Sequence, residues 1–291
     1  MSRLRVNAEF IAQLIATARA AGDAILRIYH AAEQTKVELK GDGSPVTAAD
    51  LAAHHLIVAA LAQLLPVPIV SEEAELPPFS ERRRWQRYWL IDPLDGTKEF
   101  IQRNGEFTVN IALVEAGVPV FGVVHIPVSD ETYLGVDKSL SPDSLPLAEK
   151  YIAGNKVATL QTRSLAQRLA SRETLDVLVS HRHGGHATED LLQNLQARWP
   201  APLQYLKAGS SLKFCWLAEG RADFYPRLAP TSEWDTAAAQ AVLVAAGGMV
   251  MNAEDFRELR CNRGESLLNP WFLAVADKDA DWQKLLGFQA R

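Results

Sequence analysis

Residues 89–101 read Trp-Leu-Ile-Asp-Pro-Leu-Asp-Gly-Thr-Lys-Glu-Phe-Ile. The apolar run that opens this stretch predicts the end of a buried strand. Pro93 should stop the strand at Asp92, because proline fixes its own φ and favours an extended residue before it. Gly96 permits a tight turn, and Thr97 follows it where a short helix can begin. The stretch therefore predicts a strand, a bend and a helix start in close succession.

The bend gathers oxygen atoms. Asp92 and Asp95 bracket Leu94, so two carboxylates and one backbone carbonyl can share one edge. Magnesium prefers such oxygen ligands, and the N–H groups of the following helix start suit an anion such as phosphate. Asp-Pro and Asp-Gly are also ordinary turn pairs, so the stretch taken alone is equally consistent with a simple turn.

The composition of the chain narrows its class. Its 291 residues suit one large domain or two closely packed ones, and 48% hydrophobic with 22% charged residues is typical of a soluble globular protein. The net charge of −5 argues against a nucleic-acid binder, which should be basic. Cys215 and Cys261 are far apart and fit neither a zinc site nor a disulfide framework, which favours a reducing compartment.

The chain is expected in the cytoplasm. Arg3 and Arg5 precede an apolar region faintly like a signal peptide, but polar residues interrupt that region. The most apolar stretches, 56–70 and 237–251, are too short to span a bilayer. Peripheral contact with the cytoplasmic side of the inner membrane stays open, as does the choice between a monomer and a homodimer.

Hydrophobic periodicity predicts helices and strands along the whole chain. Helices are expected over residues 7–30, 47–65, 188–199 and 209–220, and from 233 to about 246. Strands are expected over residues 68–71, 107–113, 120–128, 132–136, 175–179 and 222–228. Residues 138–150 contain two prolines and little pattern, so we expect two domains, 1–140 with a helix pair, an antiparallel sheet and most metal ligands, and 141–291.

Three further acidic residues lie at the ends of expected elements. Asp50 has capping-box spacing from Thr47, so it is either a helix-start acid or a catalytic group. Glu72 follows a short strand and is either a site residue or part of a solvated loop. Asp235 opens the last expected helix and is either a ligand or an N-cap.

The second half of the chain also contributes candidate anion and metal ligands. Ser210 and Lys213 lie at a serine-rich helix start, a plausible phosphate seat whose alternative is simple capping, and Arg227 lies on the next strand. The histidines of the stretch 181–186 could hold zinc or nickel, although no acid or cysteine lies beside them in sequence.

Four motifs in fixed order give the chain a family resemblance. Residues 45–50, 71–73, 92–97 and 234–236 together resemble the inositol monophosphatase and fructose-1,6-bisphosphatase superfamily. The stretches 88–114 and 209–215 look more narrowly like the bacterial 3′(2′),5′-bisphosphate nucleotidases of sulfate assimilation. The resemblance implies an α/β (α+β) fold, a five-layered α-β-α-β-α sandwich. It also implies removal of the 3′-phosphate from adenosine 3′,5′-bisphosphate, giving AMP and phosphate.

The resemblance also implies roles for individual residues. Two or three magnesium ions would be held by Glu72, Asp92, the Leu94 carbonyl, Asp95 and Asp235. Asp50 and Thr97 would orient and deprotonate the attacking water, and lithium would inhibit by displacing one magnesium. The small-molecule nucleotide substrate would contact Glu72, Leu94, Asp95, Gly96, Thr97, His183, Ser210, Lys213, Arg227 and Asp235, the last domain supplying the second-phosphate site. Glu233 adds an acid where the family pattern has a neutral residue, which puts the charge beside Asp235 in question.

Physical chemistry supports a metal-dependent reaction. Carboxylates that converge in one cleft repel one another unless cations are bound. Hydrolysis of a phosphate monoester can need up to a ~10²¹-fold acceleration, of which a general base supplies only ~10²–10⁴-fold. No aspartyl phosphoenzyme motif occurs, so direct attack by water is expected. Two alternatives stay open, an inositol or sugar monophosphatase and a catalytically silent sensor of metal and anion.

Overall fold

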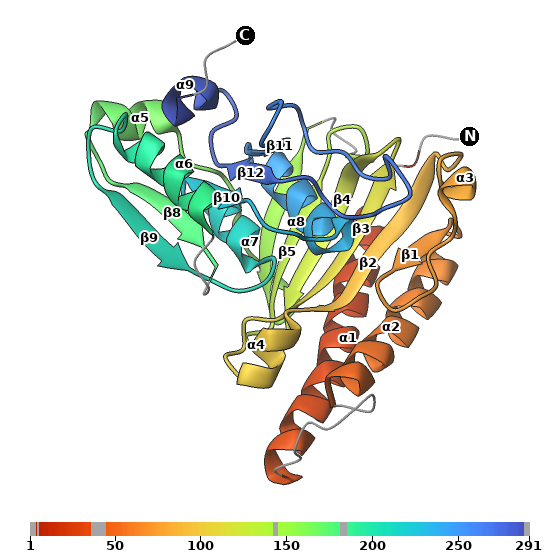
Figure 1. Cartoon of the computed structure of the whole chain (residues 1–291). Coiled ribbons are helices and arrows are strands. Elements are labelled where there is room, and N and C mark those ends of the chain that lie inside the picture. The colour runs from red at the N-terminus through yellow and green to blue at the C-terminus, as the bar shows by residue number, and fades with distance from the viewer. Residues whose placement is uncertain (1–3, 5, 36–44, 142–144, 181–184, 288–291) are drawn as a thin grey trace.

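The apolar alternation of the first half builds a long, mostly antiparallel sheet. The computed structural model describes residues 4, 6–35, 45–141, 145–180 and 185–287 (Figure 1). Its seven-stranded first sheet, ordered β1 to β7, consists of β1 Ile69–Ser71, β2 Arg87–Asp95, β3 Thr108–Glu115, β4 Val118–Ile126, β5 Glu131–Val136, β6 Leu147–Ile152 and β7 Asn155–Thr159. Only β1 and β2 pair in parallel, and every later neighbour is antiparallel. The three expected antiparallel strands are confirmed.

Strands β6 and β7 extend this sheet beyond the expected domain boundary at residues 140 and 141. Neither strand was expected from the sequence. The residues of β7, an edge strand, are all exposed, so its sequence shows no apolar alternation. The division of the chain into two domains at that boundary stays a prediction, and the first sheet runs on to Thr159.

The stretch 89–101 differs from the sequence-based expectation at one point. Strand β2 does not stop at Asp92 but continues to Asp95, with a register shift between those two residues. Pro93 has no N–H to donate, so the pairing is interrupted locally, and a bulge does this without ending the strand. Gly96 then adopts a φ of 102°, and helix α4, Thr97–Gln102, begins as expected.

Two helices cover the outer face of the first sheet. Helix α1, Ala8–Thr35, begins after Asn7, whose side chain accepts the N–H of Phe10 at 2.8 Å, and helix α2 is Pro45–Leu64. The ring of Phe10 stacks on that of the fully buried Trp89 in β2, so the apolar side of α1 lies directly on this strand.

Part of helix α2 has the length and composition of a membrane span. The 18-residue window Thr47–Leu64 has a mean hydropathy of 1.2, and 28% of it is buried. The two stretches expected to be most apolar, 56–70 and 237–251, did not include the whole of this window, because alanines make it only moderately apolar. Ala49, Ala53, Ile57 and Leu61 are nevertheless buried in the core shared with α1 and the first sheet, and core helices pass the same test.

Helices α7, Leu212–Ala218, and α8, Glu233–Ala245, fill the space between the two sheets. A Cβ at Gly122 or Gly135 would overlap the α8 backbone near Ala238 or Val242. These glycines of β4 and β5 therefore let α8 lie directly on the first sheet, and this close contact places the start of α8 opposite β2 (Figure 1).

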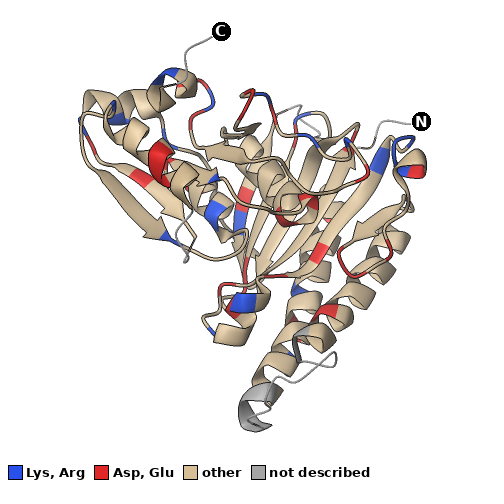
Figure 2. Cartoon of the chain, viewed as in Figure 1, with Lys and Arg blue, Asp and Glu red and all other residues tan. Residues whose placement is uncertain are grey.

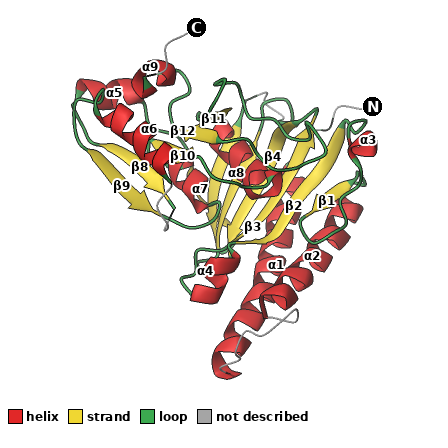
Figure 3. Ribbon diagram, viewed as in Figure 1, coloured by secondary structure: helices red, strands yellow, loops and turns green. Residues whose placement is uncertain are grey.

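A five-stranded second sheet completes the fold. Its order is β11-β12-β10-β8-β9, formed by β8 Leu175–Val179, β9 Leu203–Lys207, β10 Phe224–Arg227, β11 Met249–Asn252 and β12 Phe272–Val275. Its outer face carries α5 Leu165–Ala170, α6 His186–Gln196 and α9 Trp282–Leu286, while α3 Phe79–Arg82 lies before β2. Figure 3 shows the resulting layers. Three apolar cores separate helix, sheet, helix, sheet and helix, which confirms the five-layered α-β-α-β-α sandwich.

Candidate active site

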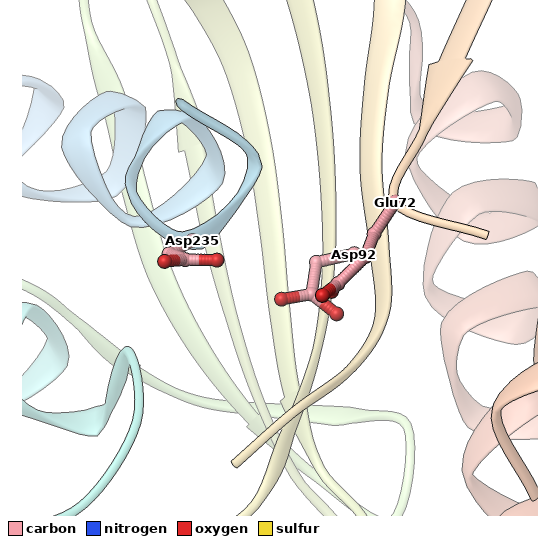
Figure 4. Close-up of side chains that lie close together, drawn as sticks. All are labelled: Glu72, Asp92 and Asp235. Atoms are coloured by element: carbon pink, nitrogen blue, oxygen red, sulfur yellow. The ribbon is translucent and has the colours of Figure 1, made fainter. Parts of the chain in front are cut away.

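Three carboxylates meet between the two sheets. Glu72 directly follows β1, Asp92 lies in β2, and Asp235 lies in the first turn of α8 (Figure 4). The parallel register pairs Ser71 with Ile91, which brings Glu72 beside Asp92. One carboxylate oxygen from each of the three residues lies within 4.8 Å of the others. Residues that are 163 positions apart in the chain therefore form one acidic cluster.

The cluster is electrostatically unfavourable as it stands. Burial, together with the charges of Asp95 and Glu72, raises the pKa of Asp92 well above its ordinary value. Burial and the charge of Asp95 raise the pKa of Asp235 to about 7. An all-oxygen set of mutually repelling carboxylates fits a hard divalent cation, whose charge would cancel the repulsion.

Asp95 is near the cluster but faces a different set of partners. Its Oδ2 accepts hydrogen bonds from the Ser210 hydroxyl at 2.5 Å, the Ser211 N–H at 2.8 Å and the Ser211 hydroxyl at 2.7 Å. Its carboxylate is not among the three that meet within 4.8 Å. Leu94 is buried, and its N–H donates to Asp92 Oδ1 at 3.0 Å, so the bulge also orients Asp92.

Asp50 does not cap its helix. Helix α2 begins at Pro45, before Thr47, so the expected capping-box spacing does not mark the helix start. The Asp50 side chain is buried, and its Oδ1 has no hydrogen-bond partner among the described residues. Burial, and then the charges of Glu73 and Glu72, raise the pKa of Asp50 to about 8. A buried and unsatisfied carboxyl of this kind marks a candidate functional group.

A cavity of about 520 Å³ opens beside the acidic cluster. It is lined by seven of the expected site residues, Asp95, Gly96, Thr97, Ser210, Lys213, Arg227 and Asp235. Thr97 is the first residue of α4 and is exposed to the cavity, and the N-cap position is taken by Gly96. Acidic and basic side chains thus line the same cavity.

The two basic residues of the cavity are already partly engaged. Lys213 is buried, and its Nζ donates to the backbone carbonyls of Ser210 at 2.8 Å and Ala208 at 3.2 Å. Burial lowers the pKa of Lys213 to about 8. Arg227 Nη1 donates to the Ser180 hydroxyl at 2.9 Å, while its buried Nε has no partner among the described residues.

Three other sequence expectations have different outcomes. His183 and His181 lie outside the described residues, and His186 is exposed with its Nδ1 3.6 Å from Glu189 Oε2. Glu233 points away from the cluster, because both of its oxygens accept the N–H of Asn262 at 2.8 Å. Asp235 is not the N-cap of α8. That position belongs to Ser232, and Asp235 is the third residue of a capping box.

Sequence reasoning missed the residues that support the site. Ser211, Thr108 and Asn110 form hydrogen bonds around Asp95, and Ser180 supports Arg227. The only sequence signal was the second serine of the Ser-Ser pair. Thr108 and Asn110 looked like the polar alternate positions of a half-exposed strand, yet both are buried.

The chain is similar to known proteins in both sequence and fold. A sequence model of the inositol monophosphatase family matches residues 6–278. The 3′(2′),5′-bisphosphate nucleotidase CysQ of Salmonella typhimurium is 44% identical over 261 residues, which cover 89% of this chain and 97% of the relative. CysQ of Haemophilus influenzae is 34% identical over 287 residues, which cover 98% of this chain and 99% of the relative. The crystal structure of CysQ from Bacteroides thetaiotaomicron has a TM-score of 0.77 and 40% identity, covering 93% of this chain and 98% of that one.

Proposed function

The chain belongs to the inositol monophosphatase family, and on that basis we propose that it is a magnesium-dependent 3′(2′),5′-bisphosphate nucleotidase. It would remove the 3′-phosphate of adenosine 3′,5′-bisphosphate, leaving AMP and phosphate, in support of sulfate assimilation. The observation that carries the proposal is the 520 Å³ cavity, whose lining includes both the acidic Asp95 and Asp235 and the basic Lys213 and Arg227. Such a cavity suits a substrate with one phosphate to be cleaved at the acidic cluster and a second phosphate to be bound by cations.

In this proposal, some acidic residues bind the metal ions and others orient and deprotonate the attacking water. Two or three magnesium ions would be held by Glu72, Asp92, the Leu94 carbonyl, Asp95 and Asp235. When bound, they would neutralise the carboxylates, stabilise the charge of the phosphoryl oxygens and make water a stronger acid. Asp50 and Thr97 would orient the attacking water and take its proton, and a nearby cation would bring the raised pKa of Asp50 down to a range where it is ionised at neutral pH.

The reaction needs no covalent intermediate. The oxygen of water would form a bond to phosphorus on the side opposite the 3′ oxygen, as the bond from phosphorus to that oxygen breaks. The 3′ oxygen would take up one proton from solvent water and leave as a hydroxyl, which balances the proton lost by the attacking water. Ser210, Lys213 and Arg227, with Gly96, would hold the rest of the nucleotide, and His183 is assigned there by family resemblance alone. Binding energy from this non-reacting part can orient the phosphate that is cleaved.

We also propose a cytoplasmic location for the enzyme, since both Cys215 and Cys261 are buried free thiols, which suits a reducing compartment. Contact with the inner membrane stays a hypothesis, and the exposed Leu51 and Leu56 of α2 are the apolar residues that it would use. The proposed chemistry holds for a monomer or a homodimer alike.

Phosphate release by the purified full-length chain tests the proposal. Adenosine 3′,5′-bisphosphate and inositol 1-phosphate are each assayed with magnesium and with a chelator in its place. We expect rapid release from the bisphosphate that requires magnesium. Faster release from inositol 1-phosphate would make the chain a monophosphatase, and no release from either substrate would make it a sensor.

A further inference from the structure

The carboxylate of Asp95 is held from the second half of the chain. Its three shortest hydrogen bonds come from Ser210 and Ser211, both in the loop 208–211 that precedes α7, and longer ones come from Asn110 and Thr108. All three bonds reach the same oxygen, Oδ2, although a carboxylate has two. Among the described residues, Oδ1 is left without a comparable partner, so it is the oxygen that stays available to a cation.

The hydroxyl of Ser211 is itself held in one orientation. The Asn110 side-chain amide donates to Ser211 Oγ at 2.7 Å, so the single hydroxyl proton must point to an acceptor. Two acceptors are in reach, Asp95 Oδ2 at 2.7 Å and the backbone carbonyl of Asp235 at 3.1 Å. Ser211 therefore touches two residues that are assigned to the metal site, one from each side of the cleft.

Burial makes this arrangement rigid. Ser211 and Asn110 are each only 1% exposed, so water cannot replace a lost hydrogen bond without entering the core. Asn110 lies on β3, and its register partner is Asp92, so the amide that orients Ser211 is carried by the strand next to the metal ligands. Polar groups that orient metal ligands in this way set affinity without touching the metal.

We propose that Ser211, oriented by Asn110, is a positioning residue for the metal site. It turns Oδ2 of Asp95 toward the loop 208–211, so that Oδ1 faces the cleft, and it couples this carboxylate to the start of α8. This inference rests on the proposed function, because it requires that Asp95 serve a bound cation. The second half of the chain, which already supplies Asp235, would then also orient a ligand that the first half supplies.

Magnesium binding to the substrate-free full-length chain tests the inference. Titration calorimetry with Mg²⁺ alone compares the wild type with Ser211→Ala, and we expect about 10-fold weaker binding, in the range for groups that orient metal ligands. Thr132→Val is the matched control. It removes another buried hydroxyl, bonded to His125 at 2.9 Å in the first sheet, and should lower stability without changing the affinity for magnesium.

A double-mutant cycle with Asn110→Ser distinguishes orientation from a general loss of packing. Asn110 donates to Ser211 at 2.7 Å and to Asp95 Oδ2 only at a longer 3.4 Å. Because Asn110 acts mainly through Ser211, the two substitutions together should weaken binding by clearly less than the sum of their separate effects. If Ser211→Ala does not fold, the magnesium affinity of Asn110→Ser alone tests the inference. Equal affinity of the wild type and both variants would overturn the inference and leave the proposed function standing. No binding to the wild type would instead count against the proposed function.

Discussion

At the scale of single residues, neighbours in sequence serve different purposes. Glu233 and Asp235 are two positions apart at the start of α8, yet Asp235 belongs to the acidic cluster and Glu233 binds Asn262. Successive positions in a helix face different directions, so the extra acid does not add its charge to the site. The question that the sequence raised about Glu233 is thereby answered.

The substitution Glu233→Gln should make stability less dependent on pH. Burial raises the pKa of Glu233 to about 7 from an ordinary 4.5, so the folded chain binds more protons than the unfolded chain between these values. The contribution of Glu233 to stability is thus fully present at low pH and is lost as pH rises through about 7.

Glutamine keeps an oxygen for the Asn262 N–H and cannot ionise. Unfolding by denaturant at pH values below and above this window should therefore show a decline in stability that is smaller in Glu233→Gln by roughly 1–3 kcal/mol. The magnesium requirement should not change. A variant that needs much more magnesium would return Glu233 to the metal site.

The substitution Thr97→Ala should separate catalysis from capping. Gly96 is the N-cap of α4 and makes no side-chain cap bond, so the Thr97 hydroxyl is not needed to start the helix. We expect kcat to fall by about 10²-fold with little change in KM or in thermal stability, because the hydroxyl would act on the attacking water. Lower stability at unchanged kcat would contradict this role.

At the scale of elements, the loop 208–211 and helix α7 form the link between the sheets. Gly209 donates its N–H to Glu106 Oε2 at 2.7 Å, Ser210 adopts a φ of 49°, and Lys213 binds two carbonyls of the same loop. A positive φ is uncommon in a residue other than glycine, so these contacts hold the loop in a strained form. The residue with the positive φ, Ser210, is also one of the two that hold Asp95.

The basic residues of the cavity should therefore differ in their substitution effects. Lys213→Ala should lower kcat/KM for both adenosine 3′,5′-bisphosphate and adenosine 3′-monophosphate, and more for the bisphosphate, because the ammonium group holds the loop and also faces the cavity. Arg227→Ala should lower only the value for the bisphosphate, by about 10–10²-fold, the cost of a lost charge-assisted contact.

Both substrates are measured on both variants at saturating magnesium. Equal losses for the two substrates in Arg227→Ala would remove Arg227 from recognition of the second phosphate. A loss confined to the bisphosphate in Lys213→Ala would instead mean that the loop keeps its form without the ammonium group.

At the scale of the whole molecule, the acidic cluster lies where the layers meet. Glu72 and Asp92 come from the first sheet, and Asp235 comes from the helix between the sheets, within an apolar core that both sheets share. Charged residues of both signs are distributed along the elements of the fold (Figure 2). Folding therefore brings repelling charges together, at a cost that a bound cation offsets.

Magnesium should stabilise the fold more as pH rises. The raised pKa values of Asp50, to about 8, and Asp235, to about 7, exceed the ordinary value of 3.8. Without metal, the contribution of these groups is present at low pH and is lost as pH rises through those values. Ionised carboxylates bind the cation, so magnesium should recover the lost stability.

Thermal unfolding with a chelator and with excess magnesium, at about pH 6 and about pH 8, measures this effect. We expect a larger magnesium-dependent rise in Tm at the higher pH. A rise that is the same at both values, or smaller at the higher one, would mean that these carboxylates do not titrate with metal binding.

Sequence by itself determined the elements and the chemical character of the site. The expected helices that begin near Asn7, Thr97 and Glu233, and the strand 175–179, all occur, because apolar periodicity, prolines and glycines act over a few residues. The spacing of Asp92 and Asp95 predicted oxygen ligands for a metal, and the family resemblance added Glu72 and Asp235. The structure brings Glu72, Asp92 and Asp235 together. Local sequence patterns therefore predict which elements form and which chemical groups they carry.

Only the tertiary structure decided how these groups are oriented. Ser211 meets Asp95 across 116 positions, and Asn110 meets Ser211 across 101, so no local spacing could pair them. Nor could it tell that Lys213 would bind its own loop or that Glu233 would turn to Asn262. A side chain's direction along its element follows from sequence, but its partner depends on how distant layers pack. That packing is set by apolar burial over the whole chain.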